Sequence, residues 1–74
     1  MVIRKRSVTI AGHRTSLSLE DAFWDGAASI ATQRGLSLAA LIREIDEARI
    51  GRGGNLSSAI RLYVLEWARS GKAL

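Results

Sequence analysis

The feature that most constrains this chain is a short stretch of alternating residues placed directly before two amphipathic segments. Residues 14–19 read RTSLSL, so polar residues alternate with Thr15, Leu17 and Leu19. This is the period of a strand with one dry face and one wet face. Because a lone strand leaves backbone groups unpaired and other strand signals are few, we expect its partner to be the same segment of a second copy.

A second short strand is predicted at residues 7–10, SVTI, before an Ala-Gly turn. If the turn is a two-residue hairpin loop, Val8 faces Thr15 and Ile10 faces His13. The aliphatic side chains then share one face, and the other face is polar throughout. In a dimer this hairpin gives a four-stranded sheet. The alternative is a flexible arm, and residues 1–6 are predicted to be a loose basic arm in either case.

Three helices are predicted after the strand, at residues 20–35, 37–50 and 55–70. Ser18, Ser37 and Asn55 precede them as expected N-caps, and Gly35 is placed to end the first in a left-handed conformation. The first two carry one apolar stripe each. The third is apolar around much of its circumference, so we expect another subunit or protein to cover part of it.

The net charge of +4 is distributed unevenly along the chain. Residues 1–19 carry four basic residues and no acid, residues 20–48 have a net charge of −4, and residues 49–74 have a net charge of +4. A basic strand end next to an acidic middle suits contact with a polyanion. The simpler interpretation is a basic tail that aids solubility.

The order of these pieces resembles the ribbon-helix-helix family, the Arc and MetJ type of bacterial DNA-binding protein. Between Lys5 and Arg61 the chain carries KRSVTI, GHRTSLSLE, FW, RGLSLAALI and NLSSAIR, a pattern of small alphaproteobacterial members. The resemblance implies a single mainly α domain, residues 1–74, with a short N-terminal β-ribbon and an additional C-terminal helix. It also implies an intertwined homodimer whose ribbon enters the DNA major groove, and a length of 74 residues favours oligomerisation independently.

The resemblance places DNA contacts on the outward strand residues Arg14, Ser16 and Ser18. The backbone around Ser37 would grip a phosphate, and the arm Arg4, Lys5 and Arg6 would add affinity. Family members usually carry longer donors than serine, which discriminates bases poorly. The dimer interface is expected to include Leu17, Leu19, Leu41, Ile42, Ile45 and Trp67.

Two other functions fit the same fold. A dimer could hold a small anionic or zwitterionic metabolite, or a partner protein, on its polar sheet face, with Thr9, Arg14 and Ser16 as ligand donors. An antitoxin is the second alternative, in which the dimer binds DNA and the C-terminal part grips a toxin. We rank the antitoxin last, because the third helix has a cap and strong periodicity, whereas antitoxin tails are often disordered alone.

Catalysis and metal binding have little support in the sequence. The chain has one histidine and no cysteine, so His13 is expected to be a turn or interface residue, and neither an enzyme nor a metal site nor a cofactor is predicted. The glycine-rich stretch 49–54 lacks the spacing of a phosphate-binding loop. No apolar run approaches the length of a membrane span, and no signal peptide is recognisable. We expect a cytoplasmic protein without membrane contact.

Overall fold

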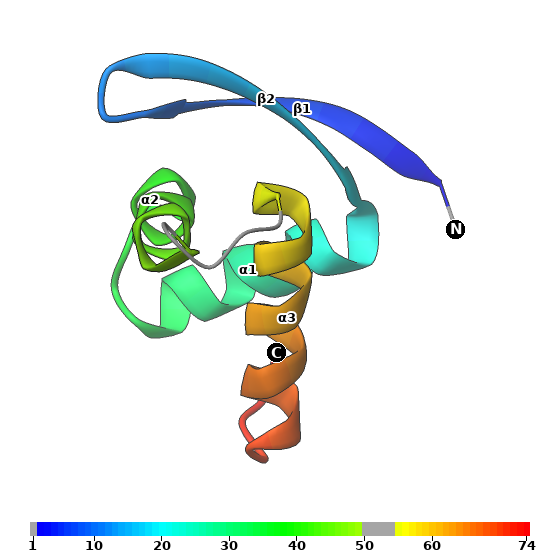
Figure 1. Cartoon of the computed structure of the whole chain (residues 1–74). Coiled ribbons are helices and arrows are strands. Elements are labelled where there is room, and N and C mark those ends of the chain that lie inside the picture. The colour runs from blue at the N-terminus through cyan, green and yellow to red at the C-terminus, as the bar shows by residue number, and fades with distance from the viewer. Residues whose placement is uncertain (1, 50–54) are drawn as a thin grey trace.

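The computed structural model describes residues 2–49 and 55–74 of the chain. Two strands are followed by three helices: β1 (Ile3–Ile10), β2 (His13–Glu20), α1 (Asp21–Gln33), α2 (Leu38–Arg49) and α3 (Leu56–Arg69). The ribbon forms one layer and the helices lie together on one side of it (Figure 1). The fold is therefore mainly α with an N-terminal β-ribbon. The predicted end of the second helix at residue 50, and most of the loop after it, lie outside the described residues.

The ribbon is a hairpin within one chain. β1 pairs antiparallel with β2, Val8 opposite Thr15 and Ile10 opposite His13, which is the predicted hairpin register. Ala11 and Gly12 have φ values of 51° and 81°, and positive φ at both central residues is the requirement of a type I′ turn, whose twist matches that of the strands. β1 therefore pairs with one edge of β2, and pairing of the other edge with a second copy, as in the expected four-stranded sheet, stays a prediction.

β1 is longer than the sequence indicated, because it starts at Ile3 and not at Ser7. Residues 3–6, expected to be a loose arm, pair with residues 17–20 of β2. The alternation continues through this part, although two arginines stand where an aliphatic face would be expected. The positive charges of these two arginines are balanced in part by an acidic residue of α1, Asp21. A pattern of apolar residues alone therefore does not predict this part of the strand.

β2 runs directly into α1, and this corrects the expected cap. Ser18 stays in the ribbon opposite Lys5, and its carbonyl oxygen accepts a hydrogen bond from Ser57 Oγ at 2.7 Å. Glu20 stands at the N-cap with extended backbone and no capping hydrogen bond from its side chain. The helix therefore begins two residues later than an N-cap at Ser18 would place it.

The other helix boundaries follow the predicted signals. Gly35 has φ 71°, and Leu36 N donates to Ala31 O at 2.8 Å in the hydrogen-bond pattern of a Schellman motif. Ser37 Oγ accepts from Ala40 N at 3.1 Å, and the Asn55 side chain accepts from Ser58 N at 2.8 Å. All three residues therefore end or cap a helix as predicted.

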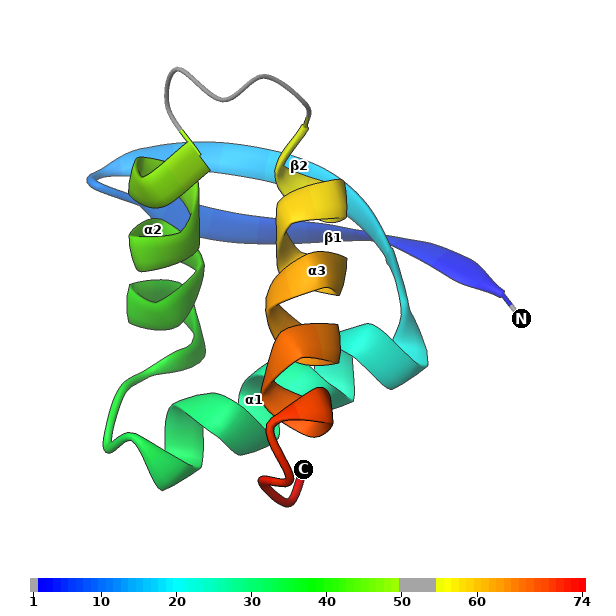
Figure 2. The ribbon, with the colours of Figure 1, turned by 60° about the horizontal axis from the view of Figure 1, so that its bottom comes forward.

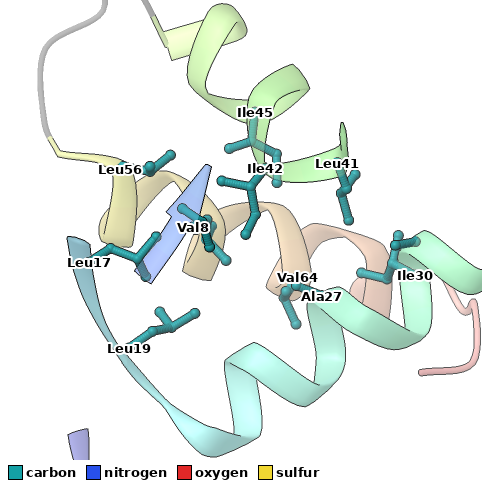
Figure 3. Close-up of a cluster of buried hydrophobic side chains, with 12 residues drawn as sticks. Val8, Leu17, Leu19, Ala27, Ile30, Leu41, Ile42, Ile45, Leu56 and Val64 are labelled. Carbon is teal, nitrogen blue, oxygen red and sulfur yellow. The ribbon is translucent and has the colours of Figure 1, made fainter. Parts of the chain in front are cut away.

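One aliphatic core lies between the ribbon and the helices (Figure 3). It contains Val8, Leu17, Leu19, Ala27, Ile30, Ala31, Leu41, Ile42, Ile45, Leu56, Ile60 and Val64. Five of the six residues expected at a dimer interface, Leu17, Leu19, Leu41, Ile42 and Ile45, are thus buried inside a single chain. They are placed there because β1 and α3 cover the surfaces that a partner was expected to cover.

α3 packs closely against α1 and leaves one side uncovered. A Cβ atom on Gly26 would lie 2.9 Å from Val64 Cγ1, so a larger residue here would force the Val64 side chain or the two helices to shift. Trp67, the sixth expected interface residue, is half-buried against the core, and its Nε1 donates to Ala73 O at 3.0 Å. Leu62 and Leu65 are exposed. No described helix is long and apolar enough to cross a membrane.

Candidate functional site

The two faces of the β1–β2 ribbon differ in what they present. By alternation, the face turned away from the helices carries Lys5, Ser7, Thr9, Arg14, Ser16 and Ser18, and all six residues are exposed. We call this set the outer face. The opposite, inner face contributes Val8, Leu17 and Leu19 to the core. The outer face therefore has side chains that are free to meet a ligand or partner.

The outer face is basic at both ends and carries hydroxyl groups between them. Arg14 pairs across the ribbon with Thr9 near the turn, whereas Lys5 pairs with Ser18 at the other end. Ser7 and Ser16 face each other between these pairs. Four residues along a strand correspond to about 13 Å, so the two cations lie about as far apart as the major groove is wide. Short hydroxyl side chains between them allow close approach of another surface.

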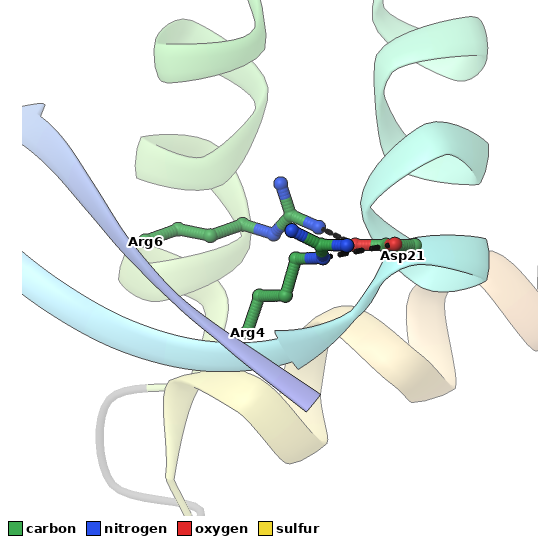
Figure 4. A network of polar contacts seen from close by, with 3 residues as sticks. All are labelled: Arg4, Arg6 and Asp21. Carbon is green, nitrogen blue, oxygen red and sulfur yellow. Dashed lines mark hydrogen bonds and ion pairs between the residues drawn. The ribbon is translucent and has the colours of Figure 1, made fainter. Parts of the chain in front are cut away.

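The three basic residues of the expected arm do not act together. Only Lys5 is on the outer face, because Arg4 and Arg6 lie on the alternate face and point to the start of α1 (Figure 4). Arg4 Nε is 3.1 Å from one carboxylate oxygen of Asp21, and Arg6 Nη2 contacts the other. Asp21 thus holds both arginines, which corrects the expectation of a free arm.

Arg6 is the more deeply placed of the two arginines. Its side chain is 19% exposed, against 63% for Arg4, and its guanidinium lies 4.6 Å from the centre of the Trp24 ring. Its Nε atom is buried and has no hydrogen-bond partner among the residues that the structure describes. Arg6 therefore depends on Asp21 and the Trp24 ring to offset the cost of its burial.

Glu20 follows the outer-face alternation but does not contribute negative charge there. Its carboxylate accepts a hydrogen bond from Arg61 Nε of α3 at 2.8 Å, and its side chain is 17% exposed. The hydrogen bond from Arg61 is the main reason that the pKa of Glu20 is lowered. The negative charge at the end of β2 is thus matched by a cation from α3.

Ser37, the expected phosphate contact, lies at the end of α2 that joins α1, and the ribbon crosses nearer the other end (Figure 2). The twelve residues of α2 span about 18 Å. Because the Ser37 side chain caps its own helix, its exposed position is explained by ordinary capping. The structure does not bring Ser37 together with the outer face.

The alternative ligand residues lie on the open surface of the ribbon. Thr9 and Arg14 are cross-strand partners, and Ser16 is two residues further along β2. A cavity of about 460 Å³ lies beneath the hairpin tip. Ser16 borders this cavity together with inner-face residues, but Thr9 and Arg14 do not. The three residues therefore share a face and not a pocket.

His13, the only histidine, is exposed beside the turn and borders the same cavity. Within the part of the chain that the structure describes, no group of three or more histidine or acidic side chains is placed to hold a metal ion. The chemistry that the site offers is therefore hydrogen bonding and positive charge.

Sequence reasoning named Lys5, Arg14, Ser16 and Ser18 as DNA contacts and put Ser7 and Thr9 on the same polar face, but it did not name those two as DNA contacts. It also treated Arg4 and Arg6 as equivalent to Lys5. Extending the period of residues 7–10 back toward the N-terminus separates them, because every second residue returns to the same face. The acid at the start of α1 is the further signal that the inward arginines have a partner.

A family model described as a ribbon-helix-helix domain matches residues 3–68. The match begins with β1 and reaches almost to the end of α3. No curated protein and no solved structure matches the chain.

Proposed function

Because the chain belongs to the ribbon-helix-helix family, whose domains are generally DNA-binding regulators and typically form homodimers, we propose that it is a bacterial transcriptional regulator. Its outer face lies in the major groove of duplex DNA, and it acts as a homodimer. A two-stranded ribbon is one of the two elements that this groove admits. The function is regulatory binding and not catalysis.

The observation that carries this proposal is the charge of the outer face. Lys5 and Arg14 supply two cations at its ends, and the face has no carboxylate between them. The neighbouring acids, Glu20 and Asp21, are engaged by arginines. A phosphate backbone therefore meets net positive charge on this face.

The side chains predict how DNA would be read. Lys5 and Arg14 are long enough to reach phosphates or a guanine edge, whereas the serine and threonine hydroxyls reach a short distance. Phosphate contacts position a protein but carry little sequence information directly. We therefore expect affinity that depends strongly on salt, with modest discrimination by the ribbon among sequences.

The test is a salt titration of duplex binding, followed by fluorescence anisotropy. Lys5→Ala and Arg14→Ala should each weaken binding and reduce the slope of log K against log salt by about 0.9 if each contacts one phosphate. Arg43→Ala is the matched control, because Arg43 is exposed on α2 and pairs with Glu47 at 2.8 Å. Its slope should stay at the wild-type value.

Arg4→Ala adds a second control within the ribbon itself. Because this arginine lies on the inner face and pairs with Asp21, its removal should change the slope less than removal of Lys5. Wild-type protein that does not bind duplex DNA at low salt would refute the proposal. Equal losses for Arg43→Ala and Arg14→Ala would refute the outer face as the contact surface.

A further inference from the structure

Arg4 and Arg6 share one carboxylate but are held differently. The Arg6 guanidinium lies 4.6 Å from the centre of the Trp24 ring, and its side chain is 19% exposed, whereas that of Arg4 is 63% exposed. Arg4 donates to Asp21 through Nε, at 3.1 Å, and its two terminal nitrogens have no partner among the described residues. Arg4 is therefore the cation of this pair that a ligand can reach.

The position of Arg4 is close to the surface that would meet DNA. It is the neighbour of Lys5, an outer-face residue, and consecutive Cα atoms are about 3.8 Å apart. β1 pairs with β2 alone among the described residues, and it stays at the edge in the expected four-stranded sheet, where a second copy pairs with the other edge of β2. The N-terminal end of β1 also projects past the helices (Figure 2). A long side chain at such an edge can direct its charged group around the strand.

Asp21 opposes contact between Arg4 and a phosphate in two ways. Its carboxylate occupies the Nε donor of Arg4. Its negative charge, on a side chain that is 47% exposed, also repels a phosphate. Two arginines and one acid leave one net positive charge, and Arg6 holds that charge beside the Trp24 ring. Arg4 therefore adds little to the charge that DNA meets while Asp21 is ionised.

We propose that Asp21 keeps Arg4 away from the DNA phosphates and thereby limits the affinity of the ribbon for duplex DNA. The inference rests on the proposed function, because it concerns the affinity of the same ribbon. Asp21 is also the first residue of α1, where an acid stabilises a helix. That role concerns stability alone, and it predicts no change in the salt dependence of DNA binding.

Asp21→Asn is the first test, in the salt titration of duplex binding. It should bind roughly two- to fivefold more tightly at near-physiological salt. Its slope of log K against log salt should be steeper by about 0.9, because Arg4 then neutralises one more phosphate. Asp25→Asn is the matched control, with the same change of charge at an exposed position of the same helix. Because no described residue forms an ion pair with Asp25, its slope should stay at the wild-type value.

A double variant shows whether Arg4 makes the added contact. In the Asp21→Asn background, Arg4→Ala should remove the gain and lower the slope by about 0.9, although it changes the wild-type slope little. A gain that persists in the double variant would overturn the inference, as would equal gains for Asp21→Asn and Asp25→Asn or no gain for Asp21→Asn. In each case, wild-type binding through Lys5 and Arg14 would leave the proposed function intact. Duplex binding by none of these proteins would refute the proposed function itself.

Nuclear magnetic resonance of the wild-type protein gives a test that does not depend on the stability of any variant. The arginine Nε–H signals report the surroundings of each guanidinium. When duplex DNA is added, the Arg14 signal should shift, and the Arg4 signal should keep its position because Arg4 remains bound to Asp21. A shift of the Arg4 signal as large as that of Arg14 would overturn the inference. An unchanged Arg14 signal would instead count against the outer face as the DNA surface.

Discussion

The outer and inner faces of the ribbon are formed by the same two strands but differ in exposure and polarity. The outer face exposes six polar side chains, whereas the inner face buries aliphatic residues and turns two arginines toward Asp21. Among the described residues, no carboxylate pairs with Lys5 or Arg14. Adjacent cations along β1 thus differ in availability, and a count of basic residues overstates the charge that a ligand meets.

The largest contrast between the faces should appear in stability. Leu19 is fully buried on the inner face, so Leu19→Ala should lower the free energy of unfolding by about 3 kcal/mol. Ser18→Ala, one residue away on the outer face, should change it by less than about 0.5 kcal/mol. The Ser18 carbonyl that accepts from Ser57 belongs to the backbone and remains. Urea unfolding measures both.

Similar losses for the two variants would show that the ribbon does not pack on the helices with this face. Leu17→Ala repeats the test at the next inner position of β2, where the side chain is also buried.

A smaller effect on stability is expected from substitution of Asp21, the acid that pairs with the two inner-face arginines. Asp21→Asn removes the negative charge that holds Arg4 and Arg6, and it leaves the mostly buried Arg6 without a counter-charge. We expect a loss of about 1–2 kcal/mol in the free energy of unfolding. Asp25→Asn, on an exposed position of the same helix, is the control and should be close to neutral. Thermal unfolding compares the two variants.

If Asp21→Asn were as stable as Asp25→Asn, the inner arginines would not need the acid. The pairing of Asp21 with Arg4 and Arg6 would then not contribute to the stability of the fold.

The smallest effect concerns Glu20, whose carboxylate at the end of β2 pairs with Arg61 of α3. Arg61 lowers the pKa of Glu20 below its ordinary value of 4.5. The contribution of this pair to stability is therefore present above pH 4.5 and is lost as the pH falls through the lower, folded pKa. The melting temperature of Arg61→Gln should consequently fall less than that of wild type on acidification below pH 4.5.

Arg34→Gln is a useful comparison at another place in the fold. Arg34 holds Glu44 through two hydrogen bonds and lowers the pKa of that carboxyl, so its removal should also flatten the acid response. Unchanged acid responses in both variants would contradict the assignment of these two pairs.

Much of the fold could be predicted from local signals. The I′-compatible turn at Ala11 and Gly12, the left-handed Gly35 and the cap at Asn55 each depend on a few neighbouring residues. The length of β1 and the start of α1 could not be predicted in this way. They depend on Asp21 meeting Arg4 and Arg6, and on Ser57 meeting the Ser18 carbonyl, contacts between residues that are far apart in the sequence.

The residues of the candidate site could be predicted where the alternation of a strand alone determines which face a side chain lies on. Arg14, Ser16 and Ser18 fall on the outer face as the pattern of β2 requires. Lys5 could be distinguished from its two neighbours only once β1 was known to reach Ile3. The aliphatic residues expected at a dimer interface are buried within one chain, and this could not be predicted for a related reason. Apolar periodicity shows that a side chain is buried, but it does not show whether its own chain or a partner covers it.

The two-residue turn has a consequence for how this ribbon forms. Closing a very short loop costs little chain entropy, and local contacts of this kind favour fast folding. The cost of bringing β1 and β2 together is also independent of protein concentration, unlike a ribbon assembled from two molecules. The two faces of the ribbon are therefore formed by a single chain, at any protein concentration at which that chain is folded.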